Sequence, residues 1–340
     1  MMPRFGTDGS SADKGGKMQR KLLGVFIEHP TTWLSGADLA AALGVSRSAV
    51  WKQIEGLRAQ GVAIEAAPRK GYRLSAEANL LTAESVAQAL PAGTNIAIEG
   101  HGLIDSTNKR AVALAGEGAP AWQVVLADAQ FAGSGRRGRD FYSPAGVGIY
   151  MSVILRPKLP AQEATLLTMA AAVAVAEAAE AFSGEPLGIK WVNDVYRGQR
   201  KIAGILTEAA LSLEEKSLRW AVVGMGLNVF PQPTVGESVY GSLFDDRPAD
   251  PLLRARLAAD ILHRLQKYLA VLADRPYLEG YRRRLFFLGK PADLVEPQGR
   301  RTVLPVDIDD MGHLIVENSD GQREVVATGE ISLRPHELGG

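Results

Sequence analysis

Residues 187–229 read LGIKWVNDVYRGQRKIAGILTEAALSLEEKSLRWAVVGMGLNV and contain no helical repeat. Their apolar residues form successive short runs separated by polar turns, which is typical of consecutive β-strands. Strands that follow one another without helices usually pair antiparallel, whereas a doubly wound sheet alternates strands with helices. The segment therefore predicts an α+β fold whose central sheet is mixed or mostly antiparallel.

The rest of the chain divides into further regions around this sheet. Helical patterns of the central region are expected at 82–90, 161–182, 250–273 and 276–286. The tail carries short strands with turns at Met311-Gly312 and Asp320-Gly321, typical of a small SH3-like barrel. We predict four regions: a disordered extension at 1–17, a helical domain at 18–75, a central α/β domain at 76–285 and the barrel at 286–336.

The composition is that of a packed soluble protein, with 46% hydrophobic and 22% charged residues. Lys+Arg and Asp+Glu both number 38, so a surface that binds polyanions must be local. The absence of cysteine excludes a disulfide framework, a zinc-thiolate site and a thiol nucleophile, and it fits a cytoplasmic location. The first residues lack the apolar core of a secretory signal. The Ala-rich helix around 166–181 is expected to be buried rather than to span a membrane.

Residues 18–75 have the order of a winged helix-turn-helix domain. Three helical patterns precede VAIEAAPRKGYRL, which alternates around a turn as a two-stranded wing does. Gly44 stands at the tight turn between the second and third helices, where a positive φ is needed. The third helix would enter a DNA major groove, and the wing would meet phosphates or the minor groove. The predicted DNA contacts are Arg47, Ser48, Trp51, Lys52, Arg69 and Lys70, with Arg73 beside them on the wing.

The charge of this region favours DNA over a protein partner. Residues 18–75 hold eight Lys and Arg against four Asp and Glu, a net charge of +4. That modest excess suits a module that binds DNA as a dimer. A three-helix protein-docking domain remains the alternative interpretation.

The segment GSGRRGRDFYSPAG, Gly133–Gly146, matches G-x-G-x-x-G in letters. A dinucleotide loop must open a helix, and an acidic residue must follow about 20 residues later. Here Pro144 and a strand-like run follow Gly138, and the position of the acidic residue holds Arg156, so the dinucleotide interpretation fails. What remains is a glycine and arginine loop between strands, suited to close over phosphates through charge-assisted hydrogen bonds. A solvated basic loop or a second nucleic-acid patch is the alternative.

Two other polar segments accompany this loop. DSTNKRA, from Asp105, places hydroxyls and backbone N–H groups at an expected helix N-terminus, which suits a small polar group. KWVNDVYRGQRKIAGILTE places Lys190, Asn193 and Asp194 at the end of one strand and in the turn, and Lys201 at the start of the next. Gly204 inside that strand indicates a closely approaching ligand or backbone.

Together these segments resemble the biotin–protein ligases, and the chain looks like the bifunctional form that also represses the biotin operon. The resemblance covers about residues 18–336. It rests on the winged helix, DSTN, the loop from Gln130, KW-x-ND, RK-x-AG-I-L, VGMGLNV and the terminal GEISLR. It implies activation of biotin by ATP and Mg²⁺ to a tightly held biotinyl-5′-AMP, then transfer to one lysine of a biotin carboxyl carrier protein. It also implies a homodimer, promoted by that intermediate, on operator DNA, and no membrane partner.

The resemblance also implies roles for individual residues. Lys201 and Arg136 would be catalytic, and Asp194 would face Mg²⁺. The implied biotin contacts are Ser106, Thr107, Asn108, Gln130, Gly133, Ser134, Gly135, Arg136, Lys201 and Gly204. The implied adenylate contacts are Arg136, Arg137, Arg139, Phe141, Lys190, Asn193, Asp194 and Asn228.

The chain departs from the family pattern at several positions. Ser134 replaces a frequent arginine and Asp140 a frequent basic residue, so the loop carries less positive charge. Phe141 replaces the more usual tryptophan as an adenine-stacking wall. Three alternatives stay open: a biotin sensor without ligase activity, a lipoyl or octanoyl transferase, and a ligase whose winged domain no longer binds DNA.

Overall fold

The structure is a computed structural model that describes residues 9–212, 214, 216–232, 240–296, 299–327 and 329–333. The chain forms two compact units. The first takes residues 1–89 together with 248–256, and the second takes residues 90–247 and 257–340.

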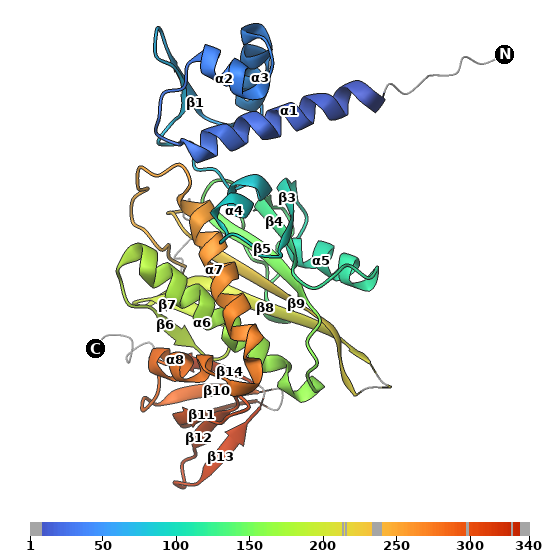
Figure 1. Cartoon of the computed structure of the whole chain (residues 1–340). Helices are drawn as coiled ribbons and strands as arrows, with labels where there is room; N and C mark the ends of the chain where they lie inside the picture. Colours follow the sequence, from blue (N-terminus) through green and yellow to red (C-terminus); the bar gives the residue numbers. More distant parts are fainter. Residues whose placement is uncertain are drawn as a thin grey trace, which may run out of the picture. The chain divides into compact units, whose positions relative to one another are not determined.

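The first unit is a helix-turn-helix followed by a β-hairpin (Figure 1). Ser46 begins the third helix by accepting a hydrogen bond from the backbone N–H of Ala49, and Gly44 ends the second helix at φ 66°. The apolar faces enclose a core that includes Leu22, Phe26 and Ile54. The elements are α1 (Gly9–Glu28), α2 (Gly36–Leu43), α3 (Arg47–Ala59), β1 (Ile64–Ala67), β2 (Gly71–Leu74) and α4 (Ala83–Ala89).

The predicted disordered extension at 1–17 needs correction. Helix α1 begins at Gly9, so residues 9–17 are helical, while residues 1–8 lie outside the described part of the chain. Few apolar residues precede Met18, which is why sequence periodicity gave no sign of this helix.

The second unit is built on a seven-stranded mixed sheet in the order β3-β4-β5-β9-β8-β7-β6. Only β3 and β4 pair parallel, and the other neighbours are antiparallel. Residues 187–229 form four successive strands, as their sequence predicts. The strands are β3 (Ala97–Ile104), β4 (Gln123–Gln130), β5 (Gly148–Leu155), β6 (Gly188–Lys190), β7 (Asp194–Arg197), β8 (Arg200–Ser212) and β9 (Ser217–Asn228).

Helices cover this sheet, and α6 forms much of the core. Its side chains are buried without a break from Leu166 to Ala176. By length and composition α6 and the turn before it would suffice to cross a membrane, but 72% of that window is buried inside the protein, as in a core helix. The helices are α5 (Thr107–Gly116), α6 (Ala164–Ser183), α7 (Leu253–Ala270) and α8 (Tyr277–Arg284), with 3₁₀ turns at Arg136–Gly138, Ala161–Glu163 and Leu272–Asp274.

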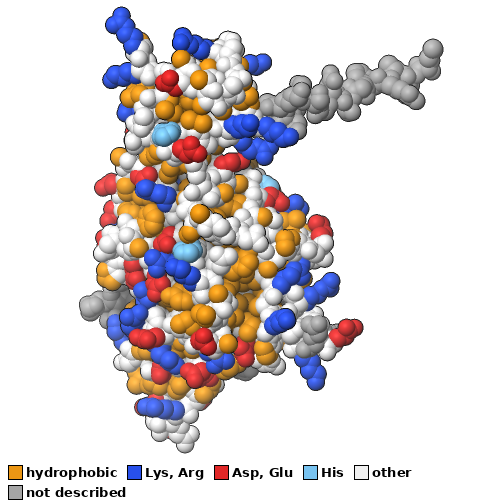
Figure 2. Space-filling view, viewed as in Figure 1, with side chains coloured by type: hydrophobic (Ala, Val, Ile, Leu, Met, Phe, Trp, Pro, Cys, Tyr) orange, Lys and Arg blue, Asp and Glu red, His pale blue; other side chains and the backbone are white. Residues whose placement is uncertain are grey.

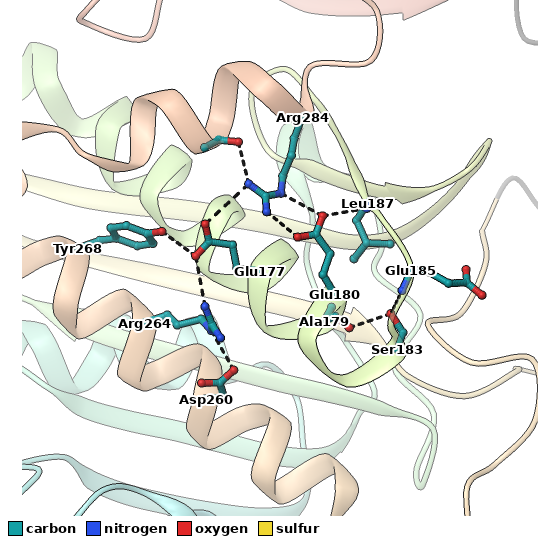
Figure 3. A network of polar contacts seen from close by, with 11 residues as sticks. Glu177, Ala179, Glu180, Ser183, Glu185, Leu187, Asp260, Arg264, Tyr268 and Arg284 are labelled. Atoms are coloured by element: carbon teal, nitrogen blue, oxygen red, sulfur yellow. Dashed lines mark hydrogen bonds and ion pairs between the residues drawn. The ribbon is translucent and has the colours of Figure 1, made fainter.

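A polar network joins α6, α7 and α8 (Figure 3). Arg284 of α8 reaches Glu180 at 2.5 Å, and Arg264 of α7 reaches Glu177 at 3.4 Å. Tyr268 donates a 2.6 Å hydrogen bond to Glu177; burial, and then this bond, raise the pKa of its hydroxyl to about 12. The network satisfies charges that would otherwise be costly to partly bury.

The chain ends in a five-stranded antiparallel sheet in the order β13-β12-β11-β10-β14. Gly312 and Gly321 lie in the predicted turns at φ 78° and 75°. The strands are β10 (Ala292–Glu296), β11 (Gly299–Ile308), β12 (Leu314–Glu317), β13 (Arg323–Val326) and β14 (Glu330–Leu333).

Candidate active site and nucleic-acid interface

A small polar cavity lies where α5 begins. Ser106 caps α5, and Thr107 donates its backbone N–H to Gln130 at the end of β4, at 2.8 Å. The cavity has a volume of about 30 Å³ in this structure. Its lining is Ser106, Thr107, Asn108, Gln130, Ser134, Phe141, Tyr150, Ser152, Gly204, Leu206, Gly224, Met225 and Gly226.

Three glycines form one wall of this cavity, and at two of them a larger residue would clash with a neighbour. A Cβ atom at Gly224 would collide with the side-chain amide of Asn108, and one at Gly226 would lie 2.5 Å from the Phe141 ring. A Cβ at Gly204 would lie 3.3 Å from Lys201 Nζ. The glycines thus allow an amide, an aromatic ring and an amine to approach the sheet closely.

A larger cavity of about 710 Å³ adjoins Phe141, which lines both cavities. Asn228 lines this larger space, as does Gly133. Sequence reasoning did not identify the further lining residues Arg200, Gln232 and Tyr240. Residues 233–239, which follow Gln232, lie outside the described chain.

The glycine and arginine loop is a folded hairpin, which we call the lid and define as residues 130–143. Its strands are tied by Gln130 N–H to Ser143 O at 3.0 Å, Phe141 N–H to Gly133 O at 2.9 Å and Gly135 N–H to Arg139 O at 2.7 Å. After a single 3₁₀ turn at Arg136–Gly138 the described chain continues into β5 and not into an α-helix, so the rejection of a dinucleotide loop is confirmed.

The lid arginines point to two different partners. Arg136 donates to Asn193 Oδ1 at 3.0 Å, whereas Arg139 makes a bidentate contact with Glu330 on β14, at 3.1 and 3.2 Å. Arg137 also donates to Glu330, at 3.3 Å. Burial would raise the pKa of Glu330, but the hydrogen bond from Arg139 and the charges of Arg139, Lys190 and Arg137 lower it overall. Sequence reasoning assigned Arg137 and Arg139 to the adenylate and gave no role to Glu330, although it noted the GEISLR motif that contains this residue.

Cationic groups gather beside the lid. Lys201 Nζ lies 2.6 Å from Asp194 Oδ1. Asn193 is held in place because its amide donates to Ile205 O at 3.1 Å. Burial lowers the pKa of Lys190, although the Asp194 carboxylate opposes that change. Lys190 ends β6 and Asn193 lies in the turn, as predicted, but Asp194 is the first residue of β7 and not part of the turn. None of the three lines either cavity.

Two hydrogen bonds hold the turn that contains Asn193 and leads to Asp194. Trp191 Nε1 donates to Gly312 O at 3.0 Å, and Tyr281 Oη donates to Val192 O at 3.0 Å. Tyr281 is fully buried, and this burial raises the pKa of its hydroxyl. The terminal sheet and α8 therefore hold one edge of the site, a role that sequence reasoning did not identify.

The predicted metal position has a single carboxylate. Among the described residues no group of three or more His, Cys, Asp or Glu side chains could hold a metal ion. Asp194 is already paired with Lys201. Mg²⁺ commonly binds through one or two carboxylates together with substrate phosphates. Asp194 therefore fits a metal that arrives with a nucleotide better than a resident one.

The predicted DNA contacts lie on the surface of the first unit. Arg47, Ser48 and Lys52 are exposed along α3, and Trp51 is 57% exposed, so it is not a core residue. Arg69 and Lys70 are exposed at the hairpin turn. Arg73 differs, because its guanidinium pairs with Glu65 at 2.9 Å and stacks on a tryptophan ring, Trp33, at 4.6 Å. On the visible face of this unit Figure 2 shows more Lys and Arg than Asp and Glu.

Comparison with known proteins identifies the family of this chain. An HTH domain model matches residues 18–73, a Biotin/lipoate A/B protein ligase family model matches 102–228, and a Biotin protein ligase C terminal domain model matches 297–334. The bifunctional ligase/repressor BirA of Escherichia coli is 32% identical over 308 residues, which cover 89% of this chain and 94% of that protein. The chain belongs to the biotin protein ligase family.

Other biotin protein ligases match parts of the chain. The Bacillus subtilis ligase/repressor BirA is 40% identical over 219 residues, 64% of this chain and 66% of that protein. The biotin–[acetyl-CoA-carboxylase] ligase of Paracoccus denitrificans is 34% identical over 239 residues, which cover 67% of this chain and 96% of that protein. The structure of the Aquifex aeolicus biotin protein ligase in complex with biotin and ATP matches with a TM-score of 0.58 at 26% identity. The match covers 70% of this chain and 98% of that chain.

Proposed function

We propose that this chain activates biotin with ATP and transfers the biotinyl group to a lysine of a biotin carboxyl carrier protein. The observation that carries the proposal is that Phe141 of the lid lines both the small polar cavity and the larger cavity, while Lys201 Nζ lies close to Gly204 on the wall of the small cavity. The small cavity could hold a head group and the larger one a nucleotide, with cationic side chains beside both. This arrangement suits formation of an acyl-adenylate.

The chemistry needs no nucleophile from the protein. An oxygen of the biotin carboxylate attacks the α-phosphorus of ATP, and pyrophosphate leaves, which forms biotinyl-5′-AMP. The amine of the carrier lysine then attacks the biotinyl carbonyl carbon, and AMP leaves as the amide forms. The protein has to position the reactants and stabilise negative charge in both steps.

We assign these tasks to residues on the two sides of Phe141. Thr107 and Gln130 hold the head group, while Lys201 exchanges its Asp194 partner for the carboxylate or acyl phosphate. Arg136 closes the lid over the intermediate from its position at Asn193. Asn228 and Phe141 contact the adenylate. Mg²⁺ bound by ATP would screen the phosphate charge, with Asp194 as its protein ligand.

The first unit is proposed to be a winged helix-turn-helix that represses biotin synthesis genes. The hairpin β1–β2 would be the wing, and the exposed face of α3 would read the operator. Loading with biotinyl-5′-AMP would promote the homodimer that binds two half-sites. The terminal sheet would be an SH3-like barrel, and the protein would act in the cytoplasm on the carrier of acetyl-CoA carboxylase or a related enzyme.

The ligase activity is tested by incubation of the full chain with biotin, Mg²⁺-ATP and an isolated carrier domain. Mass spectrometry of the carrier should show one added biotinyl group, and Lys201→Ala should lower the rate about 10²- to 10³-fold. Absence of transfer by the unaltered protein would leave a biotin sensor as the better assignment. Footprinting on the promoter of biotin synthesis genes tests repression. DNA protection that does not change when biotin and ATP are added would refute the coupling between biotinyl-5′-AMP and DNA binding.

A further inference from the structure

A short irregular segment, residues 240–247, lies beside the larger cavity, and we call it the strap. Gly241 N–H donates to Lys201 O at 2.8 Å, and Leu243 N–H donates to Asn228 O at 2.9 Å. These hydrogen bonds place the strap next to the start of β8 and the end of β9. Its first three residues line the larger cavity: Tyr240, Gly241 and Ser242.

The backbone of the strap lies close to β8. A Cβ atom at Gly241 would lie only 2.7 Å from the Arg200 Cβ, so a glycine is needed for this approach. Asn228, which also lines the larger cavity, donates its Nδ2 to Gly241 O at 3.2 Å. A displacement of the strap would therefore change the wall of the cavity and release this amide at the same time.

One arginine holds the strap at its other end. Arg197, the last residue of β7, donates Nη1 and Nη2 to the two carboxylate oxygens of Asp245, each at 2.8 Å. The Arg197 side chain is only 22% exposed, and the paired geometry is the one that a planar guanidinium favours. Arg197 lies between the motifs KW-x-ND and RK-x-AG-I-L and belongs to neither.

The same guanidinium binds a second carboxylate that is not part of the strap. Glu185, in the turn between α6 and β6, accepts from Arg197 Nε at 2.5 Å and from Nη2 at 2.9 Å. The hydrogen bonds from Arg197 lower the pKa of both carboxyl groups, Glu185 and Asp245, so both are charged at neutral pH. Two similar ion pairs thus share one arginine, and only one of them reaches the strap.

We propose that Arg197 and Asp245 are positioning residues that hold the strap against the larger cavity and so set the affinity for the nucleotide, not for the acid substrate. The inference rests on the proposed function, because it takes the larger cavity as the nucleotide site. Arg197 and Asp245 line neither of the two cavities, so they act through the strap. A cavity wall held in place before binding reduces the ordering cost that the ligand has to offset.

The test compares Asp245→Asn with Glu185→Gln in the full chain. Each variant keeps the size of its side chain and removes the charge of one partner of Arg197, so Glu185→Gln reports the loss of such a pair away from the strap. Pyrophosphate release is measured while ATP is varied at saturating biotin, and again while biotin is varied at saturating ATP. The two series separate the KM for ATP from the KM for biotin.

We expect Asp245→Asn to raise the KM for ATP about 3- to 10-fold, because the lost pair is bidentate but partly exposed. Its KM for biotin and its kcat should stay within about twofold of wild type, as should all three constants of Glu185→Gln. An unchanged KM for ATP in Asp245→Asn, or an equal rise in Glu185→Gln, would overturn the inference.

A double variant tests whether the two residues act as one unit. Arg197→Met removes both ion pairs and should raise the KM for ATP as much as Asp245→Asn does. The combination of Arg197→Met with Asp245→Asn should add no further rise, because residues of one contact are not additive. A combined rise equal to the product of the two single effects would show that they act separately, against the inference.

Hydrogen exchange of the nucleotide-free protein gives a readout that does not depend on catalysis. Asp245→Asn should speed amide exchange in peptides from the strap about 3- to 10-fold, since Gly241 and Leu243 donate their N–H groups there. Glu185→Gln should leave that exchange at the wild-type rate. Unchanged exchange in Asp245→Asn would contradict the clamp. Wild-type protein that released no pyrophosphate with biotin and ATP would instead refute the proposed function.

Discussion

Glu330 is the residue whose replacement should loosen the lid. Its carboxylate accepts one hydrogen bond from Arg137 and two from Arg139, across 3.1–3.3 Å. The arginine side chains are 45% and 67% exposed, so solvent screens both ion pairs. Exposed pairs contribute about 0.2–1 kcal/mol each, and the bidentate geometry of Arg139 favours the upper part of that range. The contact is then worth about 0.5–2 kcal/mol in all.

Glu330→Gln keeps the size of the side chain and removes its charge. If the lid retains biotinyl-5′-AMP, loss of about 0.5–2 kcal/mol should speed release of the intermediate roughly 2- to 30-fold. The assay forms the adenylate on the enzyme and follows its dissociation after a chase with unlabelled biotin. Asp293→Asn is a matched control, because Asp293 pairs at 2.7 Å with Arg300 inside the terminal sheet itself. The control should release the intermediate at the wild-type rate.

Salt and acid give two further checks on the same contact. Added salt should narrow the difference between Glu330→Gln and wild type, because exposed pairs are screened. The folded pKa of Glu330 is lowered from 4.5, so its contribution is present above pH 4.5 and is lost as pH falls through the lowered value. Equal release rates for both proteins at neutral pH and low salt would refute the reasoning.

Three other changes probe the site. Gly224→Ala drives a methyl group against the Asn108 amide, so the KM for biotin should rise at least about tenfold in steady-state kinetics, with folding checked by circular dichroism. Because burial lowers the pKa of Lys190, adenylation should lose activity on an alkaline limb that begins below pH 10.5, and Lys190→Arg should move this limb upward in a pH–rate profile. Tyr281→Phe leaves Val192 O without its donor; it should cost about 1–3 kcal/mol of unfolding free energy in urea titrations and lower the kcat of adenylation more than the KM for biotin.

Local patterns predicted much of the fold because the relevant forces act over a few residues. The strands of 187–229 were recognisable from short apolar runs, and the cap at Ser46 and the turn at Gly44 from residue type. Parallel pairing of β3 with β4 was not predicted, since no local pattern specifies a strand partner.

The motif residues of the site could be predicted from the sequence, but their contacts with distant residues could not, for a related reason. The motif residues Thr107 and Gln130 line the small cavity together with Phe141, and Lys201 lies near Gly204 on its wall. Glu330, however, lies 191 positions after Arg139, and Asp245 lies 48 positions after Arg197. Such partners become visible only once the sheet brings distant segments together.

The lid shows that a sequence motif alone does not specify the backbone conformation of the segment that contains it. Gly138 takes φ 71°, Gly133 has no room for a Cβ because Phe141 O would lie 2.5 Å away, and Arg137 takes φ 57° between them. A left-handed arginine is unusual, and here it lies between Arg136, which reaches Asn193, and Arg139, which reaches Glu330. The glycines that match a dinucleotide fingerprint thus permit a tight hairpin whose arginines bind two different partners, Asn193 in the turn before β7 and Glu330 on the terminal sheet.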